Sequence, residues 1–338
     1  MDSIEKIKSR LIIGDLTKNK NPLISIVIPT YKRENLLKET IESVLKQEEL
    51  NECEIIICDN DSDKNNTTLE KLLREYNCEK IYYYKNLENL GMTGNWNRCI
   101  ELARGTWVTM IHDDDYFLDG AIKKIKNYIK DYNVDLIHFE HVVKYEIEEQ
   151  LMIPKYNPRI EVIADFNFLF SPQIIAPVGS TFRKKCALEI GGFLEEFYPS
   201  LDYEFWIRFI EKYKGIKIKG DPIAVYRIFE NESLNPKTMP NCYLKDFEIR
   251  KKLKEKYKIQ YWISYLYNIK KFEEGKLEWK AKLTIDEKIE IEKKLKIYKV
   301  KKGYMLLCKI LGIFYFWRKF QKFQKKKTKK MLKIWRNN

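Results

Sequence analysis

Three consecutive aspartates, Asp113 to Asp115, are the residues of this sequence best suited to chemistry. Three adjacent carboxylates repel one another unless a cation neutralises them. Carboxylate oxygens favour hard divalent ions such as Mg²⁺ or Mn²⁺, and these ions in turn favour phosphate oxygens. An isolated acidic run is more often a solvated turn or a helix cap. This run directly follows residues 106–111, an apolar segment that predicts a buried strand, and that placement favours a metal site.

Two further polar clusters follow predicted strands. The segment Pro29–Arg33 ends the apolar run 23–29, and Asp59–Asp63 follows the run 54–58. Ligands of an open parallel sheet bind beyond the carboxyl ends of its strands, so we expect all three clusters at one site. Other kinds of nucleotide site are not supported, because the sequence has neither GxxxxGK[ST] nor a GxGxxG after the first strand.

Apolar runs and helical spacings alternate over residues 23–139, with short links between them. This alternation is typical of an α/β fold with a mostly parallel sheet covered on both faces. After residue 145 the pattern is less regular, and a basic helical region is expected from about Asn241. The expected strands are 23–29, 54–58, 81–84, 106–111, 134–139 and 225–229, and the expected helices are 35–47, 68–76, 96–103, 119–131, a short one from Lys184 and one from Asp202.

The basic charge is concentrated in the C-terminal part of the chain. The 338 residues carry a formal net charge of +14, but residues 240–338 hold 30 basic and 10 acidic residues, whereas the remainder holds 33 and 39. Such asymmetry indicates a polyanionic partner, either nucleic acid or an anionic membrane. A solvated helical face is the alternative for an isolated charge run.

The segment 303–317 favours the membrane. It contains one charged residue and would span about 22 Å as a helix, which is short of the hydrocarbon core of a bilayer. Basic and aromatic residues interleave after it, as in helices that lie in the headgroup region of an anionic membrane. A buried interface in an oligomer and nucleic-acid binding are the weaker alternatives.

The cysteines and the N-terminus predict a cytoplasmic protein. Seven cysteines without a CxxC pair argue against a disulfide framework and against structural zinc. The first ten residues mix charges and lack the apolar region of a signal peptide. No run of 18 apolar residues predicts a transmembrane helix.

Six segments, in this order and spacing, resemble the family 2 glycosyltransferases, which have the GT-A fold. They are Ile26–Tyr31, Asp59-Asn60, Asn89-Leu90-Gly91, the HDDD run from His112, Gly191-Gly192-Phe193 and Asp202–Trp206. The resemblance extends from about Pro22 to Asn235. It implies a GT-A catalytic domain over residues 22–239, with residues 1–21 as an N-terminal extension and residues 240–338 as a basic helical region that associates with a membrane.

The resemblance also implies which residues bind the nucleotide. In this family the Pro-Thr-Tyr segment and the aspartate after the second strand bind the base, usually uracil, and the Asn-Leu-Gly segment lines the nucleotide pocket. The matching residues are Pro29, Thr30, Tyr31, Asp59, Asn89, Gly91 and Asn95, with Arg33 close enough to assist. Within the acidic run, Asp113 matches the ribose-binding residue, Asp114 matches the metal ligand, and Asp115 is the second candidate ligand.

Asp202 matches the general base of the inverting members, which would accept the proton of the acceptor hydroxyl. Leu201 stands where the family has a second acid, Glu204 is the alternative base, and a pure helix-capping role is the structural alternative for Asp202. The family's Tyr-Arg-x-His segment reads Tyr226–Phe229 here, so a histidine metal ligand is missing from this loop. Arg227 could still bind phosphate.

These matches imply an inverting, metal-dependent glycosyltransferase that uses Mn²⁺ or Mg²⁺. It would move a sugar from a nucleotide diphosphate donor, expected to be UDP-linked, to a hydroxyl of a surface glycan or a lipid-linked saccharide. Residues 145–182 would form the sugar pocket, and the basic region would hold the protein on the inner face of the cell membrane. One alternative is a degenerate GT-A module without turnover, supported by Leu201 and Phe229. The other is a sugar-1-phosphate nucleotidyltransferase, which would need glycines that PTYKR lacks.

Overall fold

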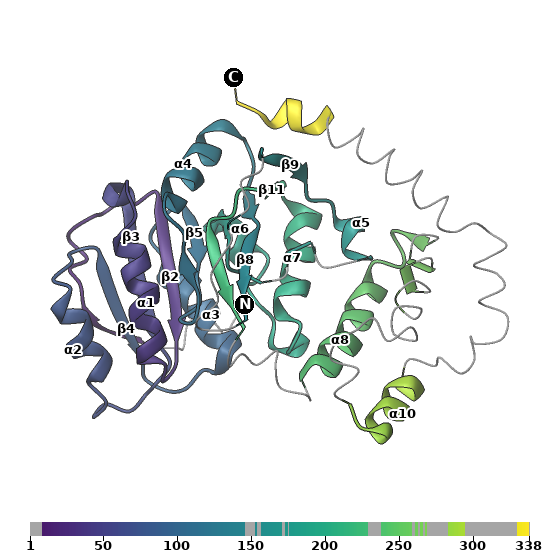
Figure 1. Cartoon of the computed structure of the whole chain (residues 1–338), viewed down its shortest axis with the longest axis horizontal. Coiled ribbons are helices and arrows are strands. Elements are labelled where there is room, and N and C mark those ends of the chain that lie inside the picture. Colours follow the sequence, from purple (N-terminus) through teal and green to yellow (C-terminus); the bar gives the residue numbers. More distant parts are fainter. Residues whose placement is uncertain are drawn as a thin grey trace.

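Strand β2 (Ile24–Thr30) lies in the centre of the main sheet and pairs in parallel with β3 (Cys53–Asp59) and β5 (Trp107–Met110) (Figure 1). Every residue of these three strands is buried, because helices cover both faces of the sheet. This computed structural model describes residues 9–145, 153, 157–170, 173–174, 176–228, 238–258, 261–262, 264–265, 268, 283–294 and 330–337.

The main sheet has nine strands in the order β1-β4-β3-β2-β5-β10-β7-β11-β9. Six of them, β4, β3, β2, β5, β7 and β11, run in one direction, which confirms the mostly parallel α/β sheet. Strand β10 runs the opposite way between β5 and β7. The remaining strands are β1 (Ser9–Ile13), β4 (Ile81–Asn86), β7 (Leu136–Phe139), β9 (Arg159–Val162), β10 (Ser180–Arg183) and β11 (Gly215–Lys219).

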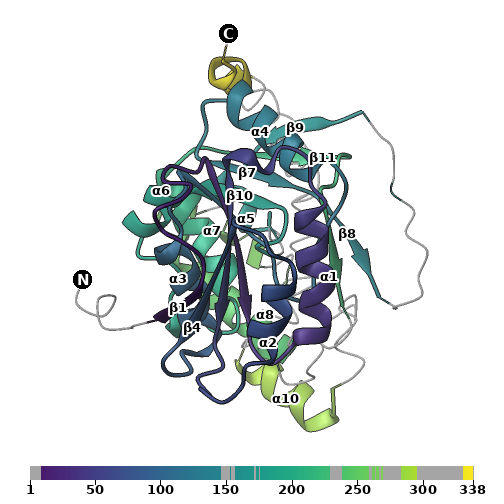
Figure 2. The same cartoon turned by 90° about the vertical axis from the view of Figure 1, so that its left-hand side faces the viewer.

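The helices form two layers, one on each face of this sheet (Figure 2). Successive side chains of a strand point to opposite faces, so Ile55 and Ile57 pack with one layer and Ile56 packs with the other. The first layer holds α1 (Glu34–Leu45), α2 (Thr68–Glu75) and α4 (Ala121–Asp131), and the second holds α3 (Gly91–Leu102), α6 (Lys184–Glu189) and α7 (Leu201–Lys212). The short helical segments are η1 (Leu50–Glu52), α5 (Asp165–Phe168) and η2 (Glu195–Phe197).

A second, three-stranded sheet lies next to the acidic run. It has the order β6-β12-β8, from β6 (Tyr116–Phe117), β12 (Ala224–Arg227) and β8 (His141–Lys144). Strand β6 begins at the residue after Asp115 and pairs with β12, with Val225 opposite Tyr116. This pairing brings a distant part of the sequence next to the acidic run. The pairing explains how Arg227 comes to contact the acidic run.

Strand β1 lies within residues 1–21, the expected N-terminal extension. It pairs antiparallel with β4 and occupies one edge of the main sheet, with Ser9 opposite Asn86. The sequence pattern did not indicate β1, nor the short strands β6, β8, β9, β10 and β11. The strand expected at 225–229 is β12, and its last predicted residue, Phe229, lies outside the described residues.

Described parts of the C-terminal region pack against the rest of the molecule. Helix α8 (Thr238–Lys252) packs on α7, and Ile249 lies in the same hydrophobic core as α7. Residues 330–337 lie beside α4 in Figure 1, and the Asn133 N–H donates a 2.7 Å hydrogen bond to the Trp335 carbonyl. Helix α10 (Ile285–Lys294) packs on α8. The segment 303–317 lies outside the described residues, and no helix among those described combines the length and apolarity that crossing a membrane requires.

Candidate functional site

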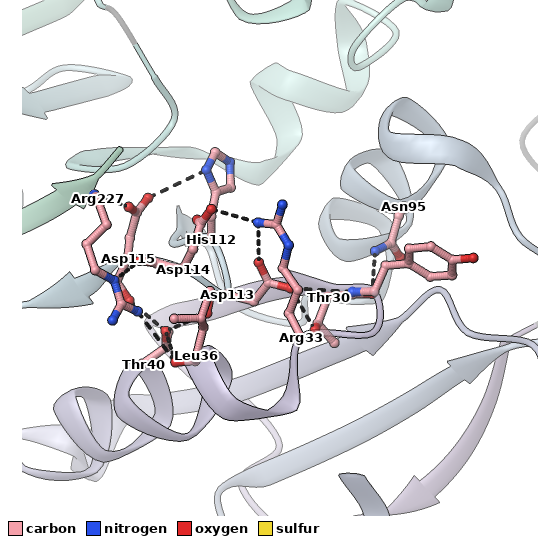
Figure 3. A network of polar contacts seen from close by, with 11 residues as sticks. Thr30, Arg33, Leu36, Thr40, Asn95, His112, Asp113, Asp114, Asp115 and Arg227 are labelled. Carbon is pink, nitrogen blue, oxygen red and sulfur yellow. Dashed lines mark hydrogen bonds and ion pairs between the residues drawn. The ribbon is translucent and has the colours of Figure 1, made fainter. Parts of the chain in front are cut away.

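The three polar clusters meet at one edge of the main sheet. Thr30 is opposite Asp59 in the register of β2 and β3, and β5 lies on the other side of β2 and leads into the acidic run. The carboxyl ends of parallel strands share an edge, which is why residues 30, 59 and 113 come together. Figure 3 shows the acidic run between Arg33 and Arg227.

Asp113 is held by the end of β2. Its Oδ2 accepts hydrogen bonds from the Thr30 hydroxyl at 2.8 Å and from the Tyr31 N–H at 3.4 Å. Burial raises the pKa of Asp113 to about 6, the negative charge of Asp114 adds to this shift, and the Thr30 hydrogen bond opposes it. Thr30 is buried, whereas Tyr31 is 43% exposed, and the Lys32 ammonium lies 5.3 Å from the centre of its ring.

Asp114 forms an ion pair with Arg33. The Arg33 Nη1 lies 2.7 Å from Asp114 Oδ2 and 3.7 Å from Asp113 Oδ1, so one guanidinium joins both carboxylates. Arg33 is at the N-cap position of α1, and its side chain is 36% exposed. The Arg33 side chain therefore lies close to the acidic run, as its place in the sequence suggested.

Asp115 is fully buried. Its Oδ1 accepts a 2.9 Å hydrogen bond from the Arg227 N–H, and its carbonyl accepts one from the Thr40 hydroxyl at 2.6 Å. Its Oδ2 has no hydrogen-bond partner among the described residues and lies 3.6 Å from the Nδ1 of His112. Burial and the charge of Asp114 raise the pKa of Asp115 well above its usual range.

His112 joins this cluster, although sequence reasoning did not include it among the metal ligands. Ligand atoms of His112, Asp114 and Asp115 all lie within 4.8 Å of one another. The imidazole stacks on Trp96 of α3, with 4.9 Å between the ring centres. Burial lowers the pKa of His112, which favours the neutral ring. Its position directly before the acidic run was the signal available in the sequence.

The predicted residues Asn89, Gly91 and Asn95 belong to a network of amides around Asn60. The Asn60 amide donates to Asn89 Oδ1 at 2.7 Å and to the Gly91 carbonyl at 3.2 Å, and its Oδ1 accepts from the Leu90 N–H. Asn60 therefore fixes the loop 89–91 against the end of β3. It is part of the motif after the second strand, but we did not predict a role for it.

Asn86 at the end of β4 completes this network. Its amide donates to Asn60 Oδ1 at 3.1 Å and to Asn95 Oδ1 at 3.0 Å. The Asn95 amide in turn donates to the Cys58 carbonyl at 3.1 Å. Three buried amides and the exposed Asn89 thus tie together the ends of β2, β3 and β4 and the start of α3.

Asp59 and Pro29 are more buried than residues that contact the nucleotide directly are expected to be. Both Asp59 oxygens accept hydrogen bonds, from the Asp61 N–H at 2.9 Å and from the Tyr83 hydroxyl at 2.8 Å. Burial raises the pKa of Asp59. Pro29 is buried within β2. These two residues lie at the expected edge, where they support the loops that follow.

Asp202 lies in the first turn of α7, on the side of α8. Ser200 occupies the N-cap position, and Asp202 is the second residue of the helix. Asp202 Oδ1 accepts a 2.8 Å hydrogen bond from the Tyr203 N–H. Burial raises the pKa of Asp202 to about 7, with a further contribution from the carboxylate of Asp246 on α8. No described contact joins Asp202 to the acidic run.

Glu204, the alternative base, and Arg227, the candidate for binding phosphate, are each buried and engaged in an ion pair. Glu204 is 2% exposed and binds Arg208 at 2.7 Å, and Arg208 also donates to the carbonyl of Gly192. Arg227 is 3% exposed. Its guanidinium pairs with Glu39 and donates a hydrogen bond to the Asp114 carbonyl, so it holds the backbone of the acidic run in place.

Comparison with known sequences identifies several relatives that are named as glycosyltransferases. The sequence model described as Glycosyl transferase family 2 matches residues 25–190. An uncharacterised glycosyltransferase of Bacillus subtilis is 30% identical over 60% of this chain and 72% of its own length. A GalNAc(5)-diNAcBac-PP-undecaprenol beta-1,3-glucosyltransferase of Campylobacter jejuni is 28% identical over 66% of this chain and 70% of its own. The chain spans 61% of the length of an uncharacterised relative from Mycobacterium tuberculosis.

Solved structures share the fold. TarS residues 1–349 of S. aureus in complex with UDP superposes with a TM-score of 0.52 and 16% identity, over 67% of this chain and 65% of that one. The mannosyltransferase PcManGT of Pyrobaculum calidifontis in complex with GDP-Man and Mn²⁺ gives 0.53 and 12%, over 89% and 87%. These likenesses confirm the GT-A fold. The sequence matches establish that the chain belongs to glycosyl transferase family 2.

Proposed function

We propose that this protein is an inverting, divalent-metal-dependent glycosyltransferase that uses a UDP-sugar. The observation that carries the proposal is the meeting of Thr30, Arg33, Asp59 and the acidic run at the carboxyl edge of the parallel strands. Membership of a family of sugar transferases favours this reaction over nucleotidyl transfer. The retained acidic run argues against a degenerate module without turnover.

The nucleotide would bind across the ends of β2, β3 and β4. The exposed ring of Tyr31 can stack on a flat base, and the amide network shapes the loop 89–91 beside it. Asp113 is the proposed ribose ligand, and its hydrogen bonds to Thr30 and Tyr31 fix the orientation of the carboxylate. In this proposal Thr30 orients the Asp113 carboxylate, and Asp59 supports the loop that follows β3.

Asp114 and Asp115 are the proposed holders of Mn²⁺ or Mg²⁺. The fit rests on the buried Asp115 Oδ2, which has no hydrogen-bond partner among the described residues, and on Asp114, which already binds a cationic guanidinium. When bound, a divalent cation neutralises the diphosphate and stabilises the charge that develops on the leaving group. Arg33 lies where it can add a second positive charge.

Asp202 is the proposed general base. A base works best when its pKa is near the working pH, and burial places the pKa of Asp202 at about 7. In an inverting reaction the carboxylate accepts the proton of the acceptor hydroxyl while that oxygen attacks the anomeric carbon. The buried salt bridge of Glu204 leaves that residue poorly suited to the same task.

The acceptor is proposed to be a glycan or a lipid-linked saccharide at the inner face of the cell membrane. A relative is named for a saccharide linked to undecaprenol, and residues 240–338 carry the basic charge that an anionic surface attracts. We propose residues 22–239 as the catalytic unit and residues 240–338 as the membrane-associating region.

Donor screening tests the proposal. The purified chain would be incubated with UDP-, GDP- and dTDP-sugars and Mn²⁺, with and without a chelator, and nucleotide release and thermal stabilisation would be measured. We expect release of UDP and a chelator-sensitive stabilisation by UDP-sugars. Stabilisation without any release, across all donors and with acceptor extracts present, would favour the degenerate module.

A further inference from the structure

The segment after β5 holds two polar atoms that are buried without a hydrogen-bond partner in the described part of the chain. They are His112 Nε2 and Asp115 Oδ2, and the His112 nitrogen that faces Asp115 is the other one, Nδ1. A buried polar atom without a partner costs free energy, because it has given up its hydrogen bonds to water. Asp115 is fully buried and its other oxygen is engaged by the Arg227 N–H, so the free oxygen is the one directed at His112 (Figure 3).

The separation of His112 and Asp115 does not correspond to a hydrogen bond. Nδ1 and Oδ2 are 3.6 Å apart, which is too long for one. Two ligands that each lie about 2.1 Å from one ion are about 3 Å apart at adjacent positions and about 4 Å apart at opposite ones. The 3.6 Å separation falls between these values. The ligand atoms of His112, Asp114 and Asp115 all lie within 4.8 Å of one another, so the three groups would move closer together to bind one ion.

Both groups are held in place from outside the cluster. The Trp96 ring stacks on the His112 imidazole at an interplanar angle of 22°. Thr40 on α1 donates its hydroxyl to the carbonyls of Asp113 and Asp115, which fixes the backbone of the acidic run. Donor groups that are already oriented bind an ion without a large ordering cost.

We propose that His112 is a metal ligand of this site, so that the cation is held by one nitrogen and two carboxylates. This inference rests on the metal dependence proposed above and specifies its ligand set. The histidine comes from the end of β5, whereas the family resemblance places one at position 229, where this chain has Phe. An imidazole suits transition metals and carboxylates alone suit Mg²⁺, so the site should prefer Mn²⁺.

The three histidines of the chain, His112, His138 and His141, make the test specific. The full-length protein would be loaded with Mn²⁺ and UDP, and electron spin echo envelope modulation would detect any nitrogen bound to manganese. We expect an imidazole signal in the wild type and in His141→Asn, and no signal in His112→Asp. The ratio of Mn²⁺ to Mg²⁺ affinity should fall by roughly tenfold or more in His112→Asp, which restores an all-oxygen site.

The outcomes separate this inference from the proposed function. Bound Mn²⁺ without a nitrogen signal in the wild type would overturn the His112 ligand and leave metal-dependent transfer intact. A signal that persists in His112→Asp would also overturn it. Failure of both Mn²⁺ and Mg²⁺ to bind in the presence of UDP, together with chelator-resistant transfer, would overturn the metal dependence itself. The wild-type measurement decides the question even if the variant does not fold.

Discussion

The Thr30 hydroxyl donates a 2.8 Å hydrogen bond to Oδ2 of Asp113 and so links two strand ends that are 83 residues apart in the sequence. Both residues are buried. This hydrogen bond favours the ionised carboxylate against the burial that disfavours it. The proposed ribose contact therefore depends on a side chain that need not touch the nucleotide.

Removal of the Thr30 hydroxyl should weaken UDP binding. Thr30→Val keeps the shape of the side chain but leaves Asp113 with a higher pKa and a less fixed orientation. Loss of a hydrogen bond to a charged group corresponds to about 1.5–3 kcal/mol. We expect UDP affinity, measured by calorimetry at pH 7, to fall by roughly ten- to hundredfold. Thr30→Ser keeps the hydroxyl and is the matched control, so equal losses in both variants would contradict the role of the hydrogen bond.

Chelation should lower UDP affinity sharply. Arg33 pairs with Asp114 and the positive charge of Arg227 acts on the buried Asp115, and a divalent ion would link both carboxylates to the diphosphate. Asp114→Ala should lose activity and also lose the difference in UDP affinity between Mn²⁺ and chelator. Fluorescence or calorimetric titration in both conditions measures this. UDP binding by the wild type that does not change with chelator would contradict the metal assignment.

The sequence predicts the parts of this site that follow from strand ends. Residues 23–29, 54–58 and 106–111 are apolar runs because their strands are covered on both faces, and parallel neighbours place Thr30, Asp59 and Asp113 at one edge. Strands such as β10 and β11 were missed because they have only four or five residues and mixed polarity, as in STFR and GIKIK.

The remaining site residues depend on long-range geometry. Asn60 and Asn86 meet because β3 and β4 are neighbours, and isolated asparagines do not indicate which amides will pair. The buried position of Arg227 follows from the pairing of β12 with β6, which a periodicity argument does not show. His112 was not predicted as a ligand, although its position next to the acidic run made it available.

Trp335 should stabilise the catalytic unit. It is half-buried against the core beside α4, and the Lys214 ammonium lies 5.8 Å from the centre of its ring. Burial of part of an aromatic side chain contributes about 1–3 kcal/mol, so Trp335→Ala should lower the free energy of unfolding by that amount. The neighbouring Ile334 is 71% exposed, and Ile334→Ala should leave stability unchanged in the same denaturation experiment. Equal effects of the two substitutions would contradict this packing.

Truncation near residue 300 should abolish membrane binding while leaving a folded protein of lower stability. The proposed catalytic residues all precede residue 235, and 13 of the 17 basic residues after Glu292 would be lost. Each basic residue near an anionic surface contributes about 1 kcal/mol. Sedimentation with vesicles that contain phosphatidylserine, compared with neutral vesicles, measures this binding. A truncated protein that sediments as well as the full chain would show that another surface binds the membrane.

Asp202 should carry the pH dependence of transfer. Burial raises its pKa to about 7, so the carboxyl is largely protonated below pH 6 and ionised above pH 8. A general base acts only when ionised, so the rate should rise through about pH 7. The effect on stability has the opposite sign: because the folded state holds the proton more tightly than the unfolded state, the stabilisation by that proton is lost as the pH rises through 7. Asp202→Asn should remove this pH-dependent part of the free energy of unfolding.

Asp202→Asn should also lower transfer by at least about 10²-fold, since a positioned base contributes 10²- to 10⁴-fold. The amide oxygen of Asn can still accept the hydrogen bond from the Tyr203 N–H, so fold and UDP affinity should be retained. Asp246→Asn is the matched control, because Asp246 is a neighbouring carboxyl that already pairs with Arg250 at 3.4 Å. Glu204→Gln should weaken the ion pair with Arg208 and so lower stability, and it should have a smaller effect on the rate of transfer. Because inversion requires direct attack by the deprotonating hydroxyl, a retained anomeric configuration in the product, or a near-normal rate in Asp202→Asn, would refute this assignment.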